Sequence, residues 1–158
     1  ALKTENHFAL LRHAVAPGTG DPVGFSLKDC STQRNLSSVG RDQALAIGHS
    51  FRKNGIAELQ VYSSQWCRCL ETAKLLALGP VHELTELNSF FQTFERKYEQ
   101  SRALKQWILE QDNTGPFLLV THQVNISALI DVYPRSGEMI VVRYSVEGEF
   151  AVVARVKM

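Results

Sequence analysis

The sequence predicts an α/β fold: a three-layer α/β/α sandwich in which a mixed, mainly parallel sheet lies between helices on both faces. Residues 8–11 (FALL) and 117–120 (FLLV) are continuous apolar runs of the kind that buried parallel strands show. Segments with helical periodicity separate the strand-like segments, and residues 139–156 indicate a closing hairpin. The chain has 158 residues, 44% of them hydrophobic, which suits a single domain over residues 1–158 with a sizeable core.

Charge and hydropathy argue against two classes of partner. The formal net charge is +1, and lysine and arginine are scattered without runs. The chain therefore lacks the basic footprint of a nucleic-acid-binding protein or of a polybasic membrane anchor. No apolar stretch approaches the ~18 residues that a membrane span needs. We expect no nucleic-acid partner and no membrane span.

The first strand is followed by a long loop and then by a helix. Residues 14–25 contain three glycines and two prolines, which excludes regular structure there. Ser37 is a suitable cap for a helix over residues 37–53, because apolar residues recur on one face up to Phe51. The connection from the strand to this helix exceeds twenty residues. Such long loops in compact domains are usually functional.

The remaining segments continue the alternation of strands and helices. The periodicity and the turn residues predict a strand at 59–62, a helix at 66–78, a short edge strand at 80–84, a helix at 95–111, a strand at 117–120, a helix at 124–131, and a hairpin of residues 139–143 and 150–156. Strands that alternate with helices in this way favour a parallel sheet, which the hairpin extends.

Polar side chains stand where three of the predicted strands end. Arg12 and His13 follow the first strand directly, and His122 comes two residues after the second apolar run. Arg68 lies in the first turn of a helix that follows another strand. In open α/β sheets, ligands bind in the crevice outside the carboxyl ends of the strands. Because arginine holds phosphate or carboxylate bidentately and helix N-termini attract phosphate, these residues predict an anion site.

Four segments of the chain, taken together and in order, resemble the histidine phosphatase (phosphoglycerate mutase-like) superfamily, in its small single-domain type. They are residues 10–13 (LLRH), 36–44 (LSSVGRDQA), 62–73 (YSSQWCRCLETA) and 120–122 (VTH). The resemblance extends from residue 8 to about residue 130. It differs from the pattern at Ala14 and Gln123, where many members have glycine, and at Gln65, where proline is common.

The resemblance implies a role for each polar residue at the strand ends. His13 would be the catalytic nucleophile and would form a phosphohistidine. Arg12 and Arg68 would clamp the phosphate, and His122 would be the second, phosphate-binding histidine of the catalytic set. Gln123 would join this phosphate site. No metal and no cofactor is expected, because two arginines and two histidines can provide positioning and charge stabilisation for phosphoryl transfer.

The expected function is a metal-independent phosphatase that hydrolyses a phosphomonoester or a phosphohistidine through a covalent phosphohistidine. Its substrate would be a phosphorylated small molecule or a phosphoprotein. Two alternatives stay open: a phosphoglycerate mutase-type phosphotransferase and a catalytically degenerate phosphate-binding protein. The nucleophilic nitrogen of His13 must be unprotonated, so its other nitrogen needs a partner, for which we expect a backbone carbonyl in the loop of residues 18–20.

The general acid that protonates the leaving group is ambiguous. In the family it usually lies in a Leu-x-Glu stretch after the third strand. Residues 84–86 (LTE) supply Glu86, which we include as the expected catalytic acid. Residues 87–89 (LNS) fit the surrounding pattern equally well and would place Ser89 there instead.

The three cysteines of the chain help to predict the cellular compartment in which the protein works. Cys30, Cys67 and Cys69 are an odd number, so one must stay unpaired within the chain. On a helix Cys67 and Cys69 lie ~200° apart and cannot bond to each other, but either can pair with Cys30. A metal site would need two further ligands at suitable spacing, which are not found. Together with the start at Ala1, one disulfide and one thiol favour a periplasmic or otherwise exported protein, with a cytoplasmic one as the alternative.

Overall fold

Six strands form one sheet in the order β3-β2-β4-β1-β5-β6 in the computed structural model, which describes residues 2–111 and 115–158. The strands are β1 (His7–Arg12), β2 (Gln60–Ser63), β3 (Val81–Glu83), β4 (Phe117–Thr121), β5 (Met139–Tyr144) and β6 (Phe150–Val156). β3, β2, β4 and β1 pair in parallel, whereas β5 pairs antiparallel with both β1 and β6. The predicted parallel sheet with a terminal hairpin is confirmed.

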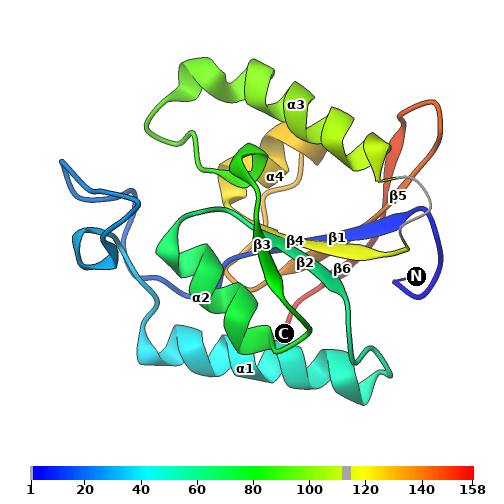
Figure 1. Cartoon of the computed structure of the whole chain (residues 1–158), viewed down its shortest axis with the longest axis horizontal. Helices are drawn as coiled ribbons and strands as arrows, with labels where there is room; N and C mark the ends of the chain where they lie inside the picture. Colours follow the sequence, from blue (N-terminus) through cyan, green and yellow to red (C-terminus); the bar gives the residue numbers. More distant parts are fainter. Residues whose placement is uncertain (1, 112–114) are drawn as a thin grey trace.

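Helices cover both faces of this sheet (Figure 1). Among the described residues they are α1 (Ser38–Lys53), α2 (Cys67–Leu76), α3 (Lys97–Glu110) and α4 (Gln123–Ile130). α1 and α2 lie together on one face, and α3 and α4 lie on the other (Figure 1). The predicted three-layer α/β/α sandwich is therefore confirmed. None of the described helices is long and apolar enough to cross a lipid bilayer.

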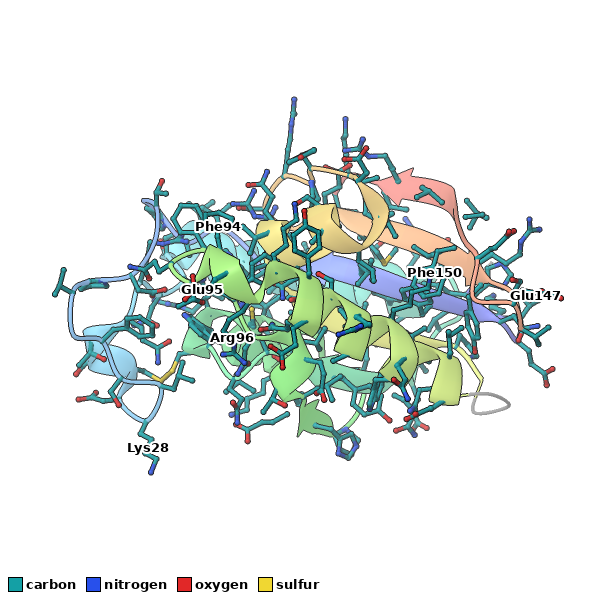
Figure 2. The ribbon with its side chains drawn as sticks, turned by 90° about the horizontal axis from the view of Figure 1, so that it is seen from above. Lys28, Phe94, Glu95, Arg96, Glu147 and Phe150 are labelled. Atoms are coloured by element: carbon teal, nitrogen blue, oxygen red, sulfur yellow. A yellow bond between two sulfur atoms is a disulfide. The ribbon has the colours of Figure 1, made fainter. Side chains whose placement is uncertain are left out.

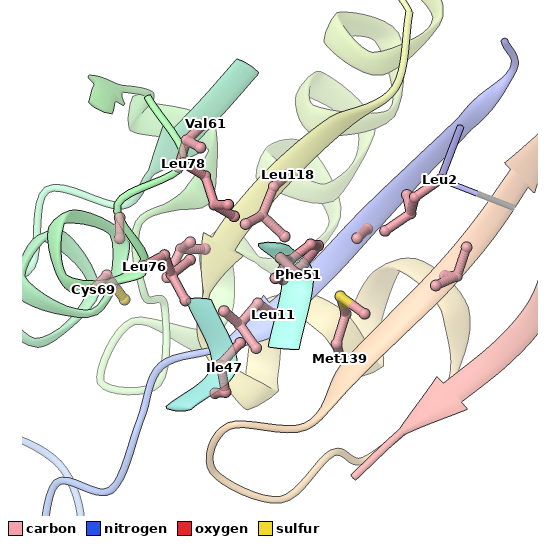
Figure 3. Packing of buried hydrophobic residues seen from close by; sticks show 14 of the residues in the cluster. Leu2, Leu11, Ile47, Phe51, Val61, Cys69, Leu76, Leu78, Leu118 and Met139 are labelled. Carbon is pink, nitrogen blue, oxygen red and sulfur yellow. The ribbon is translucent and has the colours of Figure 1, made fainter. Parts of the chain in front are cut away.

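The alternation of side chains along β1 builds a separate core on each face. Ala9 and Leu11 point toward α1 and α2, where they join a fully or nearly buried cluster that includes Ile47 (Figure 3). Phe8 and Leu10 point the other way and pack with residues of α3 and α4. Because β1 is buried on both faces, it shows the continuous apolar run from which it was predicted.

Two predicted helix ends shift for local reasons. α2 ends at Leu76, two residues before the predicted end, because Ala77 adopts the left-handed conformation with φ 52° and closes the helix. α3 begins at Lys97, because the preceding residues Phe94–Arg96 form a separate 3-10 turn. The other helices agree with the prediction to within one residue. Ser37 caps α1 as predicted, its Oγ accepting from the Gly40 backbone N–H at 3.1 Å.

The N-terminus of α1 fixes the start of the long loop after β1. The Ser37 backbone N–H donates to the Val15 carbonyl oxygen at 3.1 Å. A Cβ at Gly40 would overlap the same Val15 carbonyl, so only glycine lets the helix come this close to the loop. Helix α1 therefore anchors the chain directly after His13.

A disulfide ties the middle of this loop to α2. Cys30 and Cys67 are bonded, with their Cα atoms 5.8 Å apart, and Cys69 is a buried thiol. This selects one of the two predicted pairings. Figure 2 shows the disulfide at the end of the molecule where Lys28 projects, opposite the β5–β6 turn that carries Glu147. The bond thus links the loop to the residue that immediately precedes Arg68.

We predict that this disulfide contributes strongly to stability. It joins cysteines 37 positions apart in the sequence, and restricting the unfolded chain with a loop of that size is worth about 4 kcal/mol in the chain-entropy account. Urea denaturation of the oxidised protein with and without a reducing agent should show a loss of that order. The Cys30→Ser, Cys67→Ser double variant is the control, since its unfolding midpoint should not respond to the reducing agent. Equal midpoints for oxidised and reduced wild type would contradict the prediction.

Candidate active site

Parallel pairing of β1 with β4 brings the two predicted site histidines together. Arg12 lies opposite Thr121 at the strand ends, and the His13 backbone N–H donates to the Thr121 carbonyl at 3.0 Å. His122 follows Thr121 directly. As a result, the ring centroids of His13 and His122 lie 5.5 Å apart in an edge-to-face arrangement.

The two ring nitrogens of His13 have different partners, and these partners determine which nitrogen carries the proton. The side chain is 2% exposed, and its Nδ1 lies 2.8 Å from the Ala14 carbonyl oxygen. A carbonyl only accepts, so Nδ1 carries the proton and Nε2 carries a lone pair. Arg68 Nε donates to that Nε2 at 3.3 Å, which agrees with an unprotonated Nε2. The partner is therefore the carbonyl of the neighbouring residue, and the expected partner in the loop of residues 18–20 is wrong.

Arg12 brings an incompletely satisfied guanidinium to the same edge. Its Nη1 donates to the Pro134 carbonyl at 2.9 Å, which holds the side chain against the turn before β5. Its Nε is buried and has no hydrogen-bond partner among the described residues. Buried donors are normally satisfied, so this one indicates a ligand that accepts hydrogen bonds.

Arg68 reaches the site from the first turn of α2 and is held by a buried salt bridge. The side chains of Arg68 and Asp21 are each 3% exposed, and Arg68 Nη1 lies 2.9 Å from Asp21 Oδ1. The other oxygen of Asp21 accepts from Trp66 Nε1 at 2.9 Å. These contacts fix the guanidinium in one orientation, with its Nε beside His13.

Both ring nitrogens of His122 have polar neighbours. Its Nε2 lies 2.9 Å from Ser64 Oγ, and its Nδ1 lies 3.5 Å from Arg68 Nη2. The Cys69 sulfur contacts the ring as well, 3.5 Å from Nε2. The ring is 3% exposed. His122 is thus clamped between a hydroxyl, a thiol and an arginine.

Two site residues were missed by the sequence analysis, and both come from the long loop after β1. Asp21 holds Arg68, and Arg34 contributes a third guanidinium, which donates to the carbonyls of Gly20 and Ala16. The Asp21 carboxylate also accepts from the Arg34 backbone N–H at 3.1 Å. The only signal that could have found them is the length of the loop, because no local motif surrounds either residue.

These residues surround a small open cavity of about 130 Å³. Its lining is Arg12, His13, Gly18, Thr19, Gly20, Asp21, Arg34, Arg68, Ser89, Phe91, His122, Gln123 and Val124. The predicted residues Arg12, His13, Arg68, His122 and Gln123 are therefore brought together. Pockets for whole ligands usually measure 300–1,000 Å³, so this one is sized for a small anion and leaves the rest of a substrate outside.

The structure does not bring Glu86 to this cavity. Glu86 lies in the 3-10 turn Thr85–Leu87 and lines a separate groove with Arg96 and Gln100. Its carboxylate accepts from the Thr85 hydroxyl at 3.1 Å. Ser89 lines the cavity instead, as the alternative alignment placed it. The expectation that Glu86 points into the crevice beside His13 is corrected by this geometry.

The donor set of the site is suited to an anion and not to a metal ion. Within residues 2–111 and 115–158, no group of three or more His, Cys, Asp or Glu side chains is arranged to hold a metal. The cavity presents three guanidinium groups and a single carboxylate, and that carboxylate is already paired. Such a site binds a phosphate through hydrogen bonds and charge.

Burial and the arginines keep both histidines neutral. Burial lowers the pKa of His13 to about 3; the hydrogen bond to the Ala14 carbonyl opposes this shift, while Arg68 and the other arginines add to it. Burial likewise lowers the pKa of His122 well below its ordinary value, and the charge of Arg68 lowers it further. For Asp21, burial alone would raise the pKa, but hydrogen bonds from Arg68 and Trp66 outweigh it and hold the pKa below its usual value.

Residues 8–91 match the model of the histidine phosphatase superfamily (branch 1), which is more than half of the chain. A comparison with curated proteins found no match.

Solved structures of similar fold include three phosphatases. The putative phosphohistidine phosphatase SixA of Agrobacterium tumefaciens has 17% identity and a TM-score of 0.67, covering 98% of this chain and 99% of that one. The putative α-ribazole-5′-phosphate phosphatase of Escherichia coli has 15% identity and a TM-score of 0.72, covering 94% and 95%. A phosphoserine phosphatase of Entamoeba histolytica has 16% identity and a TM-score of 0.64, covering 94% and 95%. Identities this low show a shared fold.

We predict that acid destabilises the ligand-free protein through these histidines. Unfolded histidine has a pKa near 6.5, whereas both folded values are lower. Below about pH 6.5 the unfolded chain therefore binds more protons, and the free energy of unfolding falls as pH falls, by up to about 1.4 kcal/mol per pH unit for each histidine. Urea denaturation at pH 7, 6 and 5 measures this loss.

The matched comparison for that experiment is His13→Asn, which removes one of the two groups. Its free energy of unfolding should fall less steeply with pH than that of wild type. The same slope in both proteins would show that His13 is not held neutral in the folded state.

Proposed function

The chain belongs to the histidine phosphatase superfamily, and we propose that this phosphatase hydrolyses a phosphomonoester or a phosphohistidine through a covalent phosphohistidine on His13. One observation carries the proposal. The unprotonated Nε2 of His13 faces a small cavity into which Arg12, Arg34 and Arg68 also project. A nucleophile with no proton to lose, surrounded by cations, is what an attack on a phosphate dianion requires.

In the first step, the Nε2 lone pair of His13 attacks phosphorus. The bond from phosphorus to the leaving group breaks on the opposite side, and its electron pair departs with the leaving group. Arg12, Arg68 and His122 donate hydrogen bonds to the three remaining oxygens and stabilise the charge on them during transfer. Arg68 is best placed for this, because its Nε already lies 3.3 Å from the attacking nitrogen.

In the second step, water attacks the phosphohistidine from the open side of the cavity. The nitrogen–phosphorus bond breaks, its electron pair returns to Nε2, and inorganic phosphate leaves with the oxygen and both protons of the water. His13 keeps its Nδ1 proton on the Ala14 carbonyl throughout, so the imidazole is returned in the form in which it started. Phosphate release then frees Arg12, Arg68 and His122 for the next substrate.

The charge state of the lining residues supports one class of leaving group. Asp21 is the one carboxylate among the described lining residues, and it is held as an anion by Arg68 and Trp66. A group in that state does not donate a proton to a departing alcohol. The site therefore favours substrates whose leaving group needs no proton from the enzyme, such as the imidazole of a phosphohistidine, or substrates that carry their own acid.

Two other activities of this site have different signatures. A mutase-type phosphotransferase would also phosphorylate His13 but would pass the phosphate to a second hydroxyl of the substrate. A phosphate-binding protein would retain affinity for phosphate and never label His13. Analysis of the reaction products distinguishes the phosphotransferase from a phosphatase. Labelling of His13 with radioactive phosphate distinguishes the phosphate-binding protein from both enzymes.

We further propose that the protein works in an oxidising compartment, as an exported or periplasmic protein does. The support is the disulfide between Cys30 and Cys67, which joins two parts of the active-site framework. Disulfides persist in such compartments and are rare where thiols are kept reduced.

We predict that His13→Ala lowers kcat by about 10⁴-fold or more, because the covalent intermediate can no longer form. Quenching with detergent at alkaline pH after mixing with radiolabelled substrate should capture an alkali-stable, acid-labile phosphoenzyme in wild type and none in the variant. The matched control is His49→Ala, an exposed histidine of α1, which should label and turn over like wild type. Activity of His13→Ala within a few-fold of wild type would overturn the mechanism.

We predict that Glu86→Gln leaves activity within about twofold of wild type, because Glu86 lies outside the cavity. The measurement compares p-nitrophenyl phosphate, whose leaving group needs little protonation, with an alkyl phosphate. A selective loss of about 10²-fold on the alkyl phosphate alone would instead identify Glu86 as the acid. Asp21→Asn provides the contrast: it should slow both substrates alike, since it loosens Arg68 and removes no proton donor.

A further inference from the structure

We propose that Gln43 is a positioning residue that orients the imidazole of His13. The proposal rests on the function proposed above, in which Nε2 of His13 is the nucleophile. Gln43 lies in α1, within the segment of residues 36–44 that resembles the family pattern. Its side-chain amide acts on His13 through the peptide unit between Ala14 and Val15.

This peptide unit carries both hydrogen bonds of the argument. The Ala14 carbonyl accepts from Nδ1 of His13 at 2.8 Å, and the Val15 N–H donates to Oε1 of Gln43 at 3.0 Å. Within residues 2–111 and 115–158, the unit makes no other hydrogen bond. Because a peptide unit is planar, its N–H and its carbonyl point in opposite directions. A side chain that holds the N–H therefore also fixes the direction of the carbonyl.

The orientation of the Gln43 amide is determined by its two partners. Its Nε2 donates to the Ser136 carbonyl at 3.0 Å, in the turn before β5. A carbonyl only accepts and the Val15 N–H only donates, so exchanging the two ends of the amide would oppose like groups at both contacts. Gly137 leaves room for this arrangement, since a Cβ there would overlap the Gln43 amide.

The hydrophobic core sets the position of Gln43 relative to the nucleophile. Ile47 follows Gln43 by one turn of α1 and therefore lies on the same face of the helix. Ile47 is fully buried in one cluster with Leu11 of β1 (Figure 3). Because β1 ends at Arg12, directly before His13, the packing of α1 on β1 places the amide beside the chain that leaves the strand.

The contact with the Ala14 carbonyl is the one that can hold the His13 ring during phosphoryl transfer. In the ligand-free site the ring has a second partner, Arg68, whose Nε donates to Nε2 at 3.3 Å. In the proposed mechanism the phosphate takes over Arg68, and Nε2 bonds to phosphorus. If the peptide unit turned, its N–H would face Nδ1–H, and the ring would lose the alignment that attack on phosphorus requires. Gln43 prevents that turn.

Nuclear magnetic resonance tests the contact at His13 directly. In wild type, the Nδ1 proton of His13 should give a resolved downfield signal, which is assigned by its loss in His13→Asn. The Val15 amide should exchange slowly with solvent. Gln43→Met keeps an unbranched side chain of similar length and removes the amide oxygen. In this variant the Nδ1 signal should broaden or move upfield, and the Val15 amide should exchange at least tenfold faster. An unchanged Nδ1 signal overturns the proposal.

Activity provides the second readout. Gln43→Met should lower kcat by about tenfold or more, the scale on which groups that orient a functional histidine act. The Kd for inorganic phosphate should stay within about threefold, because Gln43 does not line the cavity. The matched control is Phe51→Leu, which shortens a buried side chain two turns further along α1 and lowers stability. It should keep the Nδ1 signal and a kcat within about twofold. Equal losses of kcat in the two variants, or a parallel loss of phosphate affinity in Gln43→Met, would overturn the proposal.

The two proposals fail separately. If wild type labels His13 and Gln43→Met turns over substrate like wild type, the Gln43 inference is wrong and the phosphatase mechanism stands. If wild type never labels His13, the mechanism is wrong, and the Nδ1 signal still decides whether Gln43 orients the ring. Should Gln43→Met fail to fold, amide exchange in wild type decides. Exchange of Val15 at the rate of an exposed loop would show that its bond to Gln43 is absent and would overturn the proposal.

Discussion

The parallel pairing of β1 with β4 is the constraint on which the site depends. It aligns Arg12 with Thr121, and so it sets His13 and His122 side by side at the same edge. A slip of one residue would turn every side chain of β1 to the opposite face and exchange its two core clusters. Because both faces are fully packed, that slip is prohibitively costly. The hydrophobic core on the two faces of the sheet thus determines the distance between the two histidines of the site.

The elements that were predicted well are those whose signal is local. The apolar runs of β1 and β4, the serine cap of α1 and the arginine in the first turn of α2 are each encoded within a few neighbouring residues. Asp21 and Arg34 were missed, because their positions depend on contacts made across the chain, with Arg68, Trp66 and the Ala16 carbonyl. No pattern within a loop of irregular structure records such contacts.

The prediction that Glu86 lies in the cavity was wrong for a different reason. Two overlapping stretches, residues 84–86 and 87–89, match the same short pattern, and only the backbone decides between them. A 3-10 turn over Thr85–Leu87 carries Glu86 to a separate groove and lets Ser89 line the cavity. Leu87 at the end of this turn is fully buried. The hydrophobic side chain thus anchors the turn and determines which way the polar residues on either side of it face.

The small size of the cavity has a consequence for chemical inhibition. About 130 Å³ lined by guanidinium and imidazole groups is enough for an oxyanion but not for the molecule that carried it. Simple mimics of phosphate, such as vanadate, would therefore fill the charged cavity completely. They would not distinguish this protein from others with the same arginines and histidines. Selective compounds must extend past the rim, where Phe91 is 40% exposed and offers an aromatic surface outside the charged centre.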